Sequence, residues 1–543
     1  MDTHGFRRFG TMIDCSRGAV MTVDAVKKWI DVTTDLGYNT LMLYTEDTYE
    51  IEGQPYFGYL RGRYSQKELQ EIDAYAADKG MELIPCIQTL AHLEAMFRWH
   101  SVYHNIRDFG DILLVGEEKT YELIDAMFAT LHRCFRSRTV NIGMDEAHML
   151  GRGQYQDRHG YQDRFDILLN HLRKVAEIAK KYDFELLMWG DMFFRLLNHE
   201  VVGGYYDKET AVPDQVRALI PDNVNLVYWD YYSKDQARYD RNIRSHAAVK
   251  DNIWFAGGLW SWAGFAPHNQ YSMEATEAAF RACINNGVQD VFLTLWGDDG
   301  GECSKFALLP SLYYASEIAK GHNDPQEIRD GFARKYGIDF DDFMLLDLLG
   351  TPNEDPGVVN PERYMLYNDC FLGVLDSTIA SEGVSKCYTP CAEKLRTLEE
   401  HQDFGYLFAT MRSLCDVLAV KYELGAQTRK AYAAGDRGAL EQITAHYSTV
   451  LERLDEFYAC FRTQWFRENK PNGFELHDIR LGGLMHRIRH CQHRLNAYLA
   501  GELDTLSELD EPLLDESGHG TEFERKSKLY QNWANNAVID ILH

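Results

Sequence analysis

Residues 139–148 read TVNIGMDEAH, a segment in which apolar residues occupy every second position up to Met144. This alternation predicts a short strand that other elements cover, and the strand leads directly into two adjacent carboxylates, Asp145 and Glu146. Neighbouring side chains of a strand point to opposite faces, so both acids can face one pocket only where the strand ends and the backbone bends. Barrel enzymes carry their catalytic residues at that end of their strands, although acids placed there can also simply cap the next helix.

Strand patterns and helical patterns alternate along the first part of the chain, on both sides of this segment. Thr22 is a typical helix-capping residue and Gly37 a typical helix-ending residue, so the first helix is expected over residues 23–36. The eight predicted strands are 8–18, 39–47, 82–88, 139–144, 185–191, 225–230, 253–262 and 290–298. The other helical patterns cover residues 66–79, 120–135, 164–182, 235–249, 272–286 and 305–319. Eight strand–helix units predict an α/β fold, a closed parallel (β/α)8 TIM barrel over residues 1–321.

Beyond residue 321 the alternation stops and only helical patterns follow. Long amphipathic segments at residues 394–425, 439–465 and 479–499 predict an all-α C-terminal domain over residues 322–543. The length of 543 residues exceeds the usual limit of a single domain, which agrees with a division into two.

The composition argues against several classes of partner and site. The formal net charge of −27 argues against nucleic acid or an anionic membrane as a partner, because both need basic patches. The N-terminus has no apolar signal region and no apolar run is long enough to span a bilayer, so we expect a cytoplasmic protein. Eleven cysteines are scattered without the paired short spacing of a zinc site, and we expect neither a metal nor another cofactor.

Polar or flat side chains stand at the end of every predicted strand. In chain order they are Arg17, Glu46 with Asp47, Gln88 with His92, Asp145 with Glu146, Trp189 with Asp191, Tyr228 with Asp230, Trp260 with Trp262, and Trp296 with Asp298. The carboxyl ends of parallel barrel strands meet at one rim, so we expect these side chains to form an active site there. Single residues still have simpler interpretations. Packing alone would explain Trp260, and capping of a helix alone would explain Asp191.

Acids and aromatic walls without a cluster of histidines suggest a sugar site. Pyranose rings stack on tryptophan, and their hydroxyls bind carboxylates and arginine. Glycoside hydrolysis needs a carboxylic acid that protonates the leaving oxygen, for which Glu146 is the natural candidate. Its neighbour Asp145 is too close in sequence for the usual pair of carboxylates that flank the scissile bond from different strands. Adjacent acids instead suit substrate-assisted cleavage, in which the 2-acetamido oxygen of the substrate attacks the anomeric carbon.

The same residues resemble those of a known enzyme family. Arg17, the segment NIGMDEAH at 141–148, and the triplets WGD at 189–191, YWD at 228–230 and WGD at 296–298 are similar to motifs of glycoside hydrolase family 20, the β-N-acetylhexosaminidases. The resemblance covers residues 8–319 and looks closest to the bacterial branch whose barrel is followed by a helical C-terminal domain. The common family signature is His-x-Gly-Gly-Asp-Glu, whereas this chain has Asn141 and Met144 at the first and fourth positions.

The resemblance implies a role for each matching residue. Glu146 would be the general acid/base, Asp145 would orient and stabilise the acetamido nitrogen as the oxazolinium forms, and Tyr228 would hydrogen-bond the acetamido oxygen. Arg17 and Asp298 would hold the outer sugar hydroxyls, which implies exo action on a terminal β-linked GlcNAc or GalNAc of an oligosaccharide or glycoconjugate. The other substrate-binding candidates are Trp189, Trp296 and one of Trp260 or Trp262 as pocket walls, Asp230 beside the tyrosine, and His92, Glu46 and Asp47 as supports of the acid pair.

Two alternative functions stay open at this point. A metal-dependent barrel hydrolase would need His and Asp ligands on several strands, and only His92 and His148 lie near the predicted rim. A catalytically inactive barrel that binds amino sugars would need the tryptophans and Arg17, but no acid at Glu146.

The sequence decides neither between GlcNAc and GalNAc nor which aglycone is used. An apolar stripe on the C-terminal helices would allow a homodimer.

Overall fold

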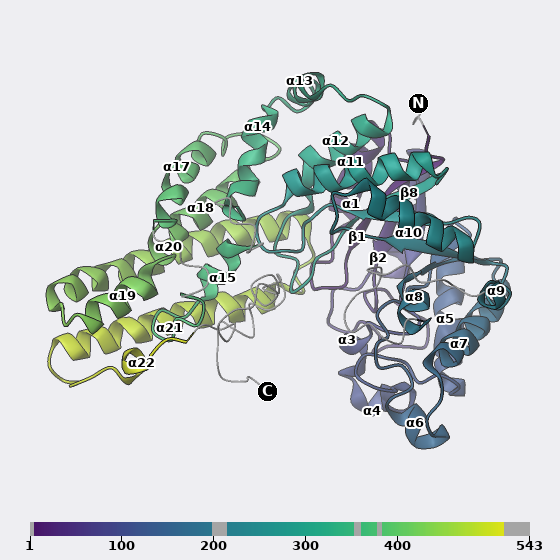
Figure 1. The fold of residues 1–543 in the computed structure, drawn as a ribbon, viewed down its shortest axis with the longest axis horizontal. Coiled ribbons are helices and arrows are strands. Elements are labelled where there is room, and N and C mark those ends of the chain that lie inside the picture. The colour runs from purple at the N-terminus through teal and green to yellow at the C-terminus, as the bar shows by residue number, and fades with distance from the viewer. Residues whose placement is uncertain (1–4, 198–213, 352–359, 377–382, 515–543) are drawn as a thin grey trace. The chain divides into compact units, whose positions relative to one another are not determined.

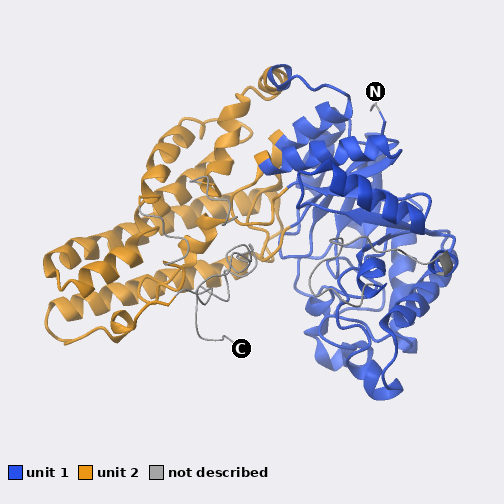
Figure 2. Ribbon diagram, in the orientation of Figure 1, with its two compact units in different colours: residues 1–259, 271–296, 311–328 blue, residues 260–270, 297–310, 329–543 orange. Residues whose placement is uncertain are grey.

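The computed structural model describes residues 5–197, 214–351, 360–376 and 383–514 (Figure 1). The chain divides into two compact units, which Figure 2 shows in different colours. Unit 1 comprises Met1–Leu259, Tyr271–Trp296 and Ser311–Ile328, and unit 2 comprises Trp260–Gln270, Gly297–Pro310 and Arg329–His543. Two short segments that directly follow the seventh and eighth strands therefore belong to unit 2.

Unit 1 contains a closed barrel of eight parallel strands, which confirms the predicted fold class. The strands are β1 Arg8–Asp14, β2 Thr40–Tyr44, β3 Glu82–Cys86, β4 Thr139–Asn141, β5 Glu185–Trp189, β6 Val224–Trp229, β7 Trp254–Gly258 and β8 Asp290–Leu295. They pair in chain order, and β1 closes the barrel against β8 with Arg8 opposite Asp290. The carboxyl ends of all eight strands therefore meet at one rim.

Helices connect successive strands of the barrel. The side chain of Thr22 accepts a hydrogen bond from Ala25 N–H at the start of the first helix, and Ser65 and Glu68 form a reciprocal capping box at the start of the second. The helices are α1 Val23–Leu36, α2 Gln66–Asp78, α3 Glu94–Phe97, α4 His100–Tyr103, α5 Glu118–Cys134, α6 Gln154–His159, α7 Arg164–Lys180, α8 Asp191–Leu197, α9 Asp214–Arg217, α10 Gln236–Val249, α11 Asn269–Asn285 and α12 Leu309–Ala319, with 3-10 helices η1 His104–Ile106 and η2 Lys305–Leu308. The sequence patterns did not predict α8 and α9.

Large side chains fill the barrel interior. The buried cluster consists of Met12, Met42, Tyr44, Ile84, Cys86, Leu187, Trp189, Val227, Trp254, Ala256 and Phe292. Trp229 and Trp296 are partly buried and pack against this cluster. The interior is therefore a packed core, and these two tryptophans lie where the core meets the rim, because they stand at the carboxyl ends of β6 and β8.

The strand that leads into the acid pair is shorter than predicted. β4 ends at Asn141 and not at Met144, because the backbone turns into left-handed conformations at Gly143, Met144 and Glu146, with φ of 73°, 69° and 52°. The apolar alternation that suggested a longer strand reflects the burial of Ile142 and Met144 inside this turn. The other seven predicted strands also end earlier than expected, for example at Asp14, Tyr44 and Gly258.

The C-terminal region is helical, as predicted. Its helices are α13 Pro325–Tyr336, α14 Phe340–Phe343, α15 Pro361–Tyr367, α17 Ser385–Arg396, α18 Gly405–Lys421, α19 Leu424–Ala433, α20 Arg437–Glu468, α21 Phe474–Leu499 and α22 Ser507–Asp510, with the 3-10 helix η3 Met344–Leu349. The prediction of one continuous helix over residues 394–425 was wrong. The chain turns tightly between α17 and α18, since a Cβ at Gly405 would lie 2.0 Å from the carbonyl oxygen of Glu399. None of the helices in the described part of the chain is both long and apolar enough to cross a membrane.

Candidate active site

The acid pair lies in the loop that follows β4, where the backbone is strained. Seven non-glycine residues of the described chain have a positive φ, and six of them lie in loops after β2, β3, β4 or β8. These six are Glu46, Leu60, His92, Met144, Glu146 and Asp299. Strain of this kind costs about 1–3 kcal/mol per residue and clusters at functional sites. Its distribution therefore points to the loops at the carboxyl ends of the strands.

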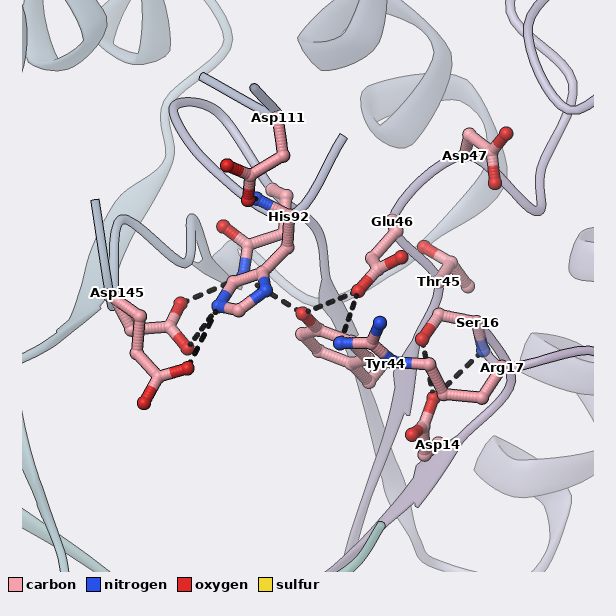
Figure 3. Close-up of polar contacts among 12 residues, drawn as sticks. Asp14, Ser16, Arg17, Tyr44, Thr45, Glu46, Asp47, His92, Asp111 and Asp145 are labelled. Atoms are coloured by element: carbon pink, nitrogen blue, oxygen red, sulfur yellow. Dashed lines mark hydrogen bonds and ion pairs between the residues drawn. The ribbon is translucent and has the colours of Figure 1, made fainter. Parts of the chain in front are cut away.

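Asp145 is held by two side chains from the loop after β3 (Figure 3). Gln88 Nε2 donates a hydrogen bond of 2.7 Å to Asp145 Oδ1, and His92 Nε2 lies 3.2 Å from Asp145 Oδ2. Burial alone would raise the pKa of Asp145, but the charge and hydrogen bond of His92 and the hydrogen bond from Gln88 lower this pKa below its ordinary value. Burial lowers the pKa of His92, yet Asp145 raises it overall to about 10. Asp145 and His92 therefore form an ion pair at neutral pH.

Glu146 has a different environment from that of its neighbour. Its side chain is 37% exposed, against 13% for Asp145. Glu146 Oε2 lies 3.6 Å from His92 Nε2, so both carboxylates approach the same imidazole. One carboxylate of the pair is thus enclosed and ionised, and the other reaches solvent. Acid–base chemistry by two carboxylates needs unequal environments of this kind.

A chain of hydrogen bonds continues from Gln88 to the loops after β1 and β2 (Figure 3). Gln88 Nε2 also donates to Tyr44 Oη at 2.9 Å, and Tyr44 Oη donates to Glu46 Oε1 at 3.1 Å. Glu46 Oε1 in turn lies 3.3 Å from Arg17 Nη2. Burial raises the pKa of Glu46, and the charge of Arg17 opposes the rise. The predicted residues Arg17 and Glu46 therefore share one polar network with the acid pair.

The glycine at position 143 makes room for Gln88. A Cβ on Gly143 would lie 2.0 Å from Gln88 Oε1, and the φ of 73° also favours glycine. Gln88 Oε1 accepts a hydrogen bond of 3.1 Å from Met144 N–H, which fixes the direction in which the amide group points. Sequence reasoning placed Gln88 at the rim without giving it a role. The structure makes it a direct support of Asp145.

Asp191, the first residue of α8, lies against the backbone of the acid pair. Its Oδ2 accepts a hydrogen bond of 3.1 Å from Glu146 N–H, and its Oδ1 accepts one of 3.4 Å from Trp229 Nε1. The side chain is completely buried. Burial raises the pKa of Asp191 to about 8, and the negative charge of Asp145 adds to the rise. Sequence reasoning placed Asp191 at the rim and in the WGD triplet but could not predict its contact with Glu146, because this contact joins two loops that are far apart in the chain.

Two predicted acids are engaged elsewhere. Asp47 Oδ1 accepts a hydrogen bond of 3.0 Å from Arg61 Nε, and in Figure 3 its carboxylate points away from the other acids. Asp230 Oδ2 accepts a hydrogen bond of 2.8 Å from Arg238 Nε. Both carboxylates are buried and paired with arginine, so the structure does not bring them to Asp145. Within the described residues, no three His, Cys, Asp or Glu side chains are grouped as metal ligands.

Tyr228 faces away from the barrel interior. Side chains alternate along β6, and Val227 belongs to the interior cluster, so Tyr228 points toward α10. Its hydroxyl donates a hydrogen bond of 3.0 Å to Asp230 Oδ2 and accepts one of 3.2 Å from Asn242 Nδ2. Its ring lies 4.8 Å from that of His246 on α10. The structure therefore does not bring Tyr228 to the acid pair.

Tyr231, three residues further along, lies on the interior side. Its ring stacks on Trp229 with 5.2 Å between centroids, and Trp296 hydrogen-bonds its hydroxyl. Burial raises the pKa of Tyr231, and the negative charge of Asp145 contributes to the rise. Sequence reasoning missed Tyr231. Strict alternation from Val227 through Trp229 is the signal that could have found it.

The predicted pocket tryptophans fall into two groups. Trp189 and Trp296 lie in unit 1 with their ring centroids 6.1 Å apart, and only Trp296 stays partly exposed at the rim. Trp260 and Trp262 lie in unit 2, where their rings stack at 4.9 Å and both are buried. Asp298 also lies in unit 2, in the segment after β8. Within that unit the buried Arg363 Nε holds the segment by a hydrogen bond of 2.7 Å to Glu302 Oε2.

Comparison with known proteins gives two family matches. The protein-family model described as "Glycosyl hydrolase family 20, catalytic domain" matches residues 5–254. The family model described as "Glycoside Hydrolase 20C C-terminal domain" matches residues 341–527. Together the two segments cover most of the chain. The chain belongs to glycoside hydrolase family 20. The matches confirm the resemblance of the motifs, including the helical C-terminal domain.

Several known proteins are similar to this chain. Hexosaminidase D from Bos taurus is 25% identical over 239 residues, which are 42% of this chain and 63% of the relative. Hexosaminidase D from Homo sapiens is 28% identical over 225 residues, 40% of this chain and 43% of the relative. A solved family 20 exo-β-N-acetylglucosaminidase from Vibrio harveyi, in complex with N-acetylglucosamine, has a TM-score of 0.47 and 15% identity, covering 63% of this chain and 58% of that one. The chain spans less than two thirds of the length of each of these proteins.

Two positions of this family 20 chain differ from the common signature. Met144 stands in place of the second glycine and adopts a left-handed φ of 69° with a fully buried side chain. Asn141 stands in place of the histidine, and its Oδ1 accepts a hydrogen bond of 2.9 Å from Gly143 N–H. These departures leave the support of Asp145 intact, because that support comes from the loop after β3.

Proposed function

We propose that this family 20 protein is an exo-acting, retaining β-N-acetylhexosaminidase that releases terminal β-linked GlcNAc or GalNAc through an oxazolinium intermediate. The observation that carries the proposal is the unequal environment of two adjacent acids, since Asp145 is enclosed and paired with His92 whereas Glu146 reaches solvent. The names of the bovine and human relatives, hexosaminidase D, support the class of substrate.

Asp145 acts on the side of the nucleophile. Its lowered pKa keeps it ionised at neutral pH. An ionised carboxylate accepts a hydrogen bond from the acetamido N–H and stabilises the positive charge that develops there as the acetamido oxygen attacks the anomeric carbon. Gln88 and His92 already hold this carboxylate in place, so little reorganisation is needed in the transition state.

Glu146 acts on the side of the leaving group. It protonates the glycosidic oxygen as the bond to the anomeric carbon breaks, and it then accepts a proton from the water that opens the oxazolinium. Each of the two steps inverts the anomeric carbon, so the configuration is retained overall. The exposure of its side chain gives Glu146 access to both the leaving group and water. The hydrogen bond from its N–H to Asp191 fixes its backbone.

We assign the acetamido oxygen to Tyr231 in place of Tyr228. The hydroxyl of Tyr228 is engaged by Asp230 and Asn242 on the α10 side of β6. Tyr231 instead stacks on Trp229 and its hydroxyl is hydrogen-bonded by Trp296, so we place the acetamido group of a bound substrate beside this hydroxyl. A positioned hydroxyl there donates a hydrogen bond to the acetamido oxygen and aims it at the anomeric carbon.

The outer hydroxyls of the sugar are assigned to Arg17 and Asp298, as the family resemblance implies. Arg17 is anchored by Glu46, and exo action follows from the binding of the outer hydroxyls that the resemblance implies. The partly exposed Trp296 provides a face for the sugar ring. The remaining proposed pocket residues are Trp189, Trp260, Trp262, Asp230, His92, Glu46 and Asp47, of which Asp47 and Asp230 act through the arginines that they bind.

Hydrolysis of 4-nitrophenyl N-acetyl-β-glucosaminide and of its galacto epimer tests the proposal. We expect turnover of at least one epimer and strong inhibition by an N-acetylglucosamine thiazoline, because the thiazoline mimics the bicyclic intermediate. The ratio of the two rates gives the sugar preference. Turnover without thiazoline inhibition would contradict the substrate-assisted mechanism, and the absence of both turnover and thiazoline binding would contradict the assigned activity.

A further inference from the structure

Three aromatic side chains, two exposed tyrosines and a partly buried tryptophan, form a cluster in the loops after β2 and β3. Tyr56 and Tyr59 belong to the loop between β2 and α2, and Trp99 stands between α3 and α4. The ring centroid of Trp99 lies 5.5 Å from that of Tyr56 and 5.3 Å from that of Tyr59, and the two tyrosine rings are 6.1 Å apart. The tyrosines are 42% and 44% exposed. We refer to these three residues as the aromatic platform.

The aromatic platform is tied to the loops that carry the candidate site. Arg61 donates a hydrogen bond of 3.0 Å to Asp47 Oδ1 and another to the carbonyl oxygen of Ser16, which joins the tyrosine segment to the loops after β1 and β2. On the other side, Phe97 N–H donates a hydrogen bond of 3.1 Å to the carbonyl oxygen of Leu93, and Leu93 directly follows His92. The platform is therefore anchored at the same rim as the acid network.

The backbone of the tyrosine segment is also built for a close approach to the site loops. Gly58 has a φ of 64°, and a Cβ there would lie 2.0 Å from the carbonyl oxygen of Asp47. Leu60, beside Tyr59, has a left-handed φ of 67° and a side chain that is 64% exposed. Strained residues with exposed apolar side chains are not explained by core packing, because packing would bury them.

The chemistry of the aromatic platform matches saccharides. The apolar faces of pyranose rings stack on tyrosine and tryptophan, and the polar edges of these side chains tolerate water. An exo enzyme holds a single sugar on the non-reducing side, so any further contact between substrate and rim has to involve the leaving group. We propose that the aromatic platform binds the saccharide on the leaving-group side of the scissile bond. The inference rests on the proposed function and deepens it from the released sugar to the remainder of the substrate.

The dependence of kcat/KM on substrate length tests this inference. We would compare N,N′-diacetylchitobiose, chitotetraose and 4-nitrophenyl N-acetyl-β-glucosaminide in the wild type and in Tyr59→Ala and Trp99→Ala. The variants should lose about three- to tenfold in kcat/KM on chitotetraose, mainly through KM, because one aromatic contact is removed. The loss on the small aryl glycoside should be smaller than the loss on chitotetraose, because a single nitrophenyl ring covers less of the aromatic platform than the remaining sugars of chitotetraose do. The matched control is Phe466→Ala, which removes a ring that is 48% exposed on α20.

Binding of chitotetraose to Glu146→Gln, measured by calorimetry, keeps this test independent of turnover. Weaker binding when Tyr59→Ala is added supports the aromatic platform even if the wild type hydrolyses none of the three substrates, an outcome that would count against the proposed function alone. Equal losses on short and long substrates, or unchanged binding of chitotetraose, would overturn the inference. A change of oligomeric state in the variants, with the length dependence preserved, would overturn it in favour of an interface between two copies of this chain.

Discussion

The segment after β4 and the segment at the end of β6 carry equally clear family motifs, but their side chains point in different directions relative to the candidate site. After β4, the adjacent acids Asp145 and Glu146 both approach His92. Near the end of β6, Tyr228 follows the alternation of its strand and points toward α10. The residue on the interior side there is Tyr231, which lies outside the motif triplet.

The cause of this difference is the backbone. The β4 segment leaves its strand early through left-handed residues at Gly143, Met144 and Glu146, which frees neighbouring side chains from the rule that they face opposite ways. β6 continues as a regular strand to Trp229, so the rule still holds at Tyr228. A motif therefore locates a functional loop, and the local backbone decides which of its residues reach the site.

The largest expected effect concerns the acid pair. Glu146→Gln should lower turnover about 10²- to 10⁴-fold on chitobiose and much less on 4-nitrophenyl glycosides, because a good leaving group needs little protonation. Asp145→Asn should slow both substrates to a similar extent, because it acts on the nucleophile whatever the leaving group. Steady-state kinetics on both substrates measure these losses. Equal losses on the two substrates in Glu146→Gln would contradict its role as the acid.

Substitutions of Tyr231 and Tyr228 test the assignment made for the end of β6. Tyr231→Phe should lower kcat by about 10²-fold, since one preorganised donor to the reacting group is lost. Tyr228→Phe removes a hydroxyl of the same kind that faces α10, so kcat should change little while the melting temperature falls. The two variants are matched controls for each other in kinetics and thermal unfolding. A larger loss of kcat in Tyr228→Phe than in Tyr231→Phe would contradict our assignment and favour Tyr228 as the residue that binds the acetamido oxygen.

The smallest expected effect is a change in how stability depends on pH. Asp191 contacts both segments, through Glu146 N–H and Trp229, and its pKa is about 8 in the folded protein. Because this folded-state pKa lies above the unfolded value of about 3.9, the group stabilises the fold fully below about pH 4, and this contribution is lost as the pH rises to about 8. Asp191→Asn should remove this loss. Between about pH 5 and pH 8, the melting temperature should therefore fall less in the variant than in the wild type. The same fall of the melting temperature in both proteins would contradict a buried, neutral Asp191.

The sequence by itself determined the architecture and predicted the location of the candidate site. Eight alternating strand and helix patterns were sufficient for the barrel, because each unit has a local periodicity and the order of the units leaves a closed barrel as the natural solution. The adjacent acids and the aromatic strand ends predicted a candidate site at one rim. The early end of β4 was missed, because the burial of Ile142 and Met144 looks the same in a strand as in a buried turn.

Only the tertiary structure decided which side chains meet. Gln88 supports Asp145 because a glycine on another strand's loop makes room for it, and Asp191 supports Glu146 across 45 residues of chain. Asp47 was a candidate support by sequence, yet Arg61 holds its carboxylate away from the network. These outcomes depend on contacts between distant segments and on backbone conformations after the strands end. Periodicity within one segment carries no information about either.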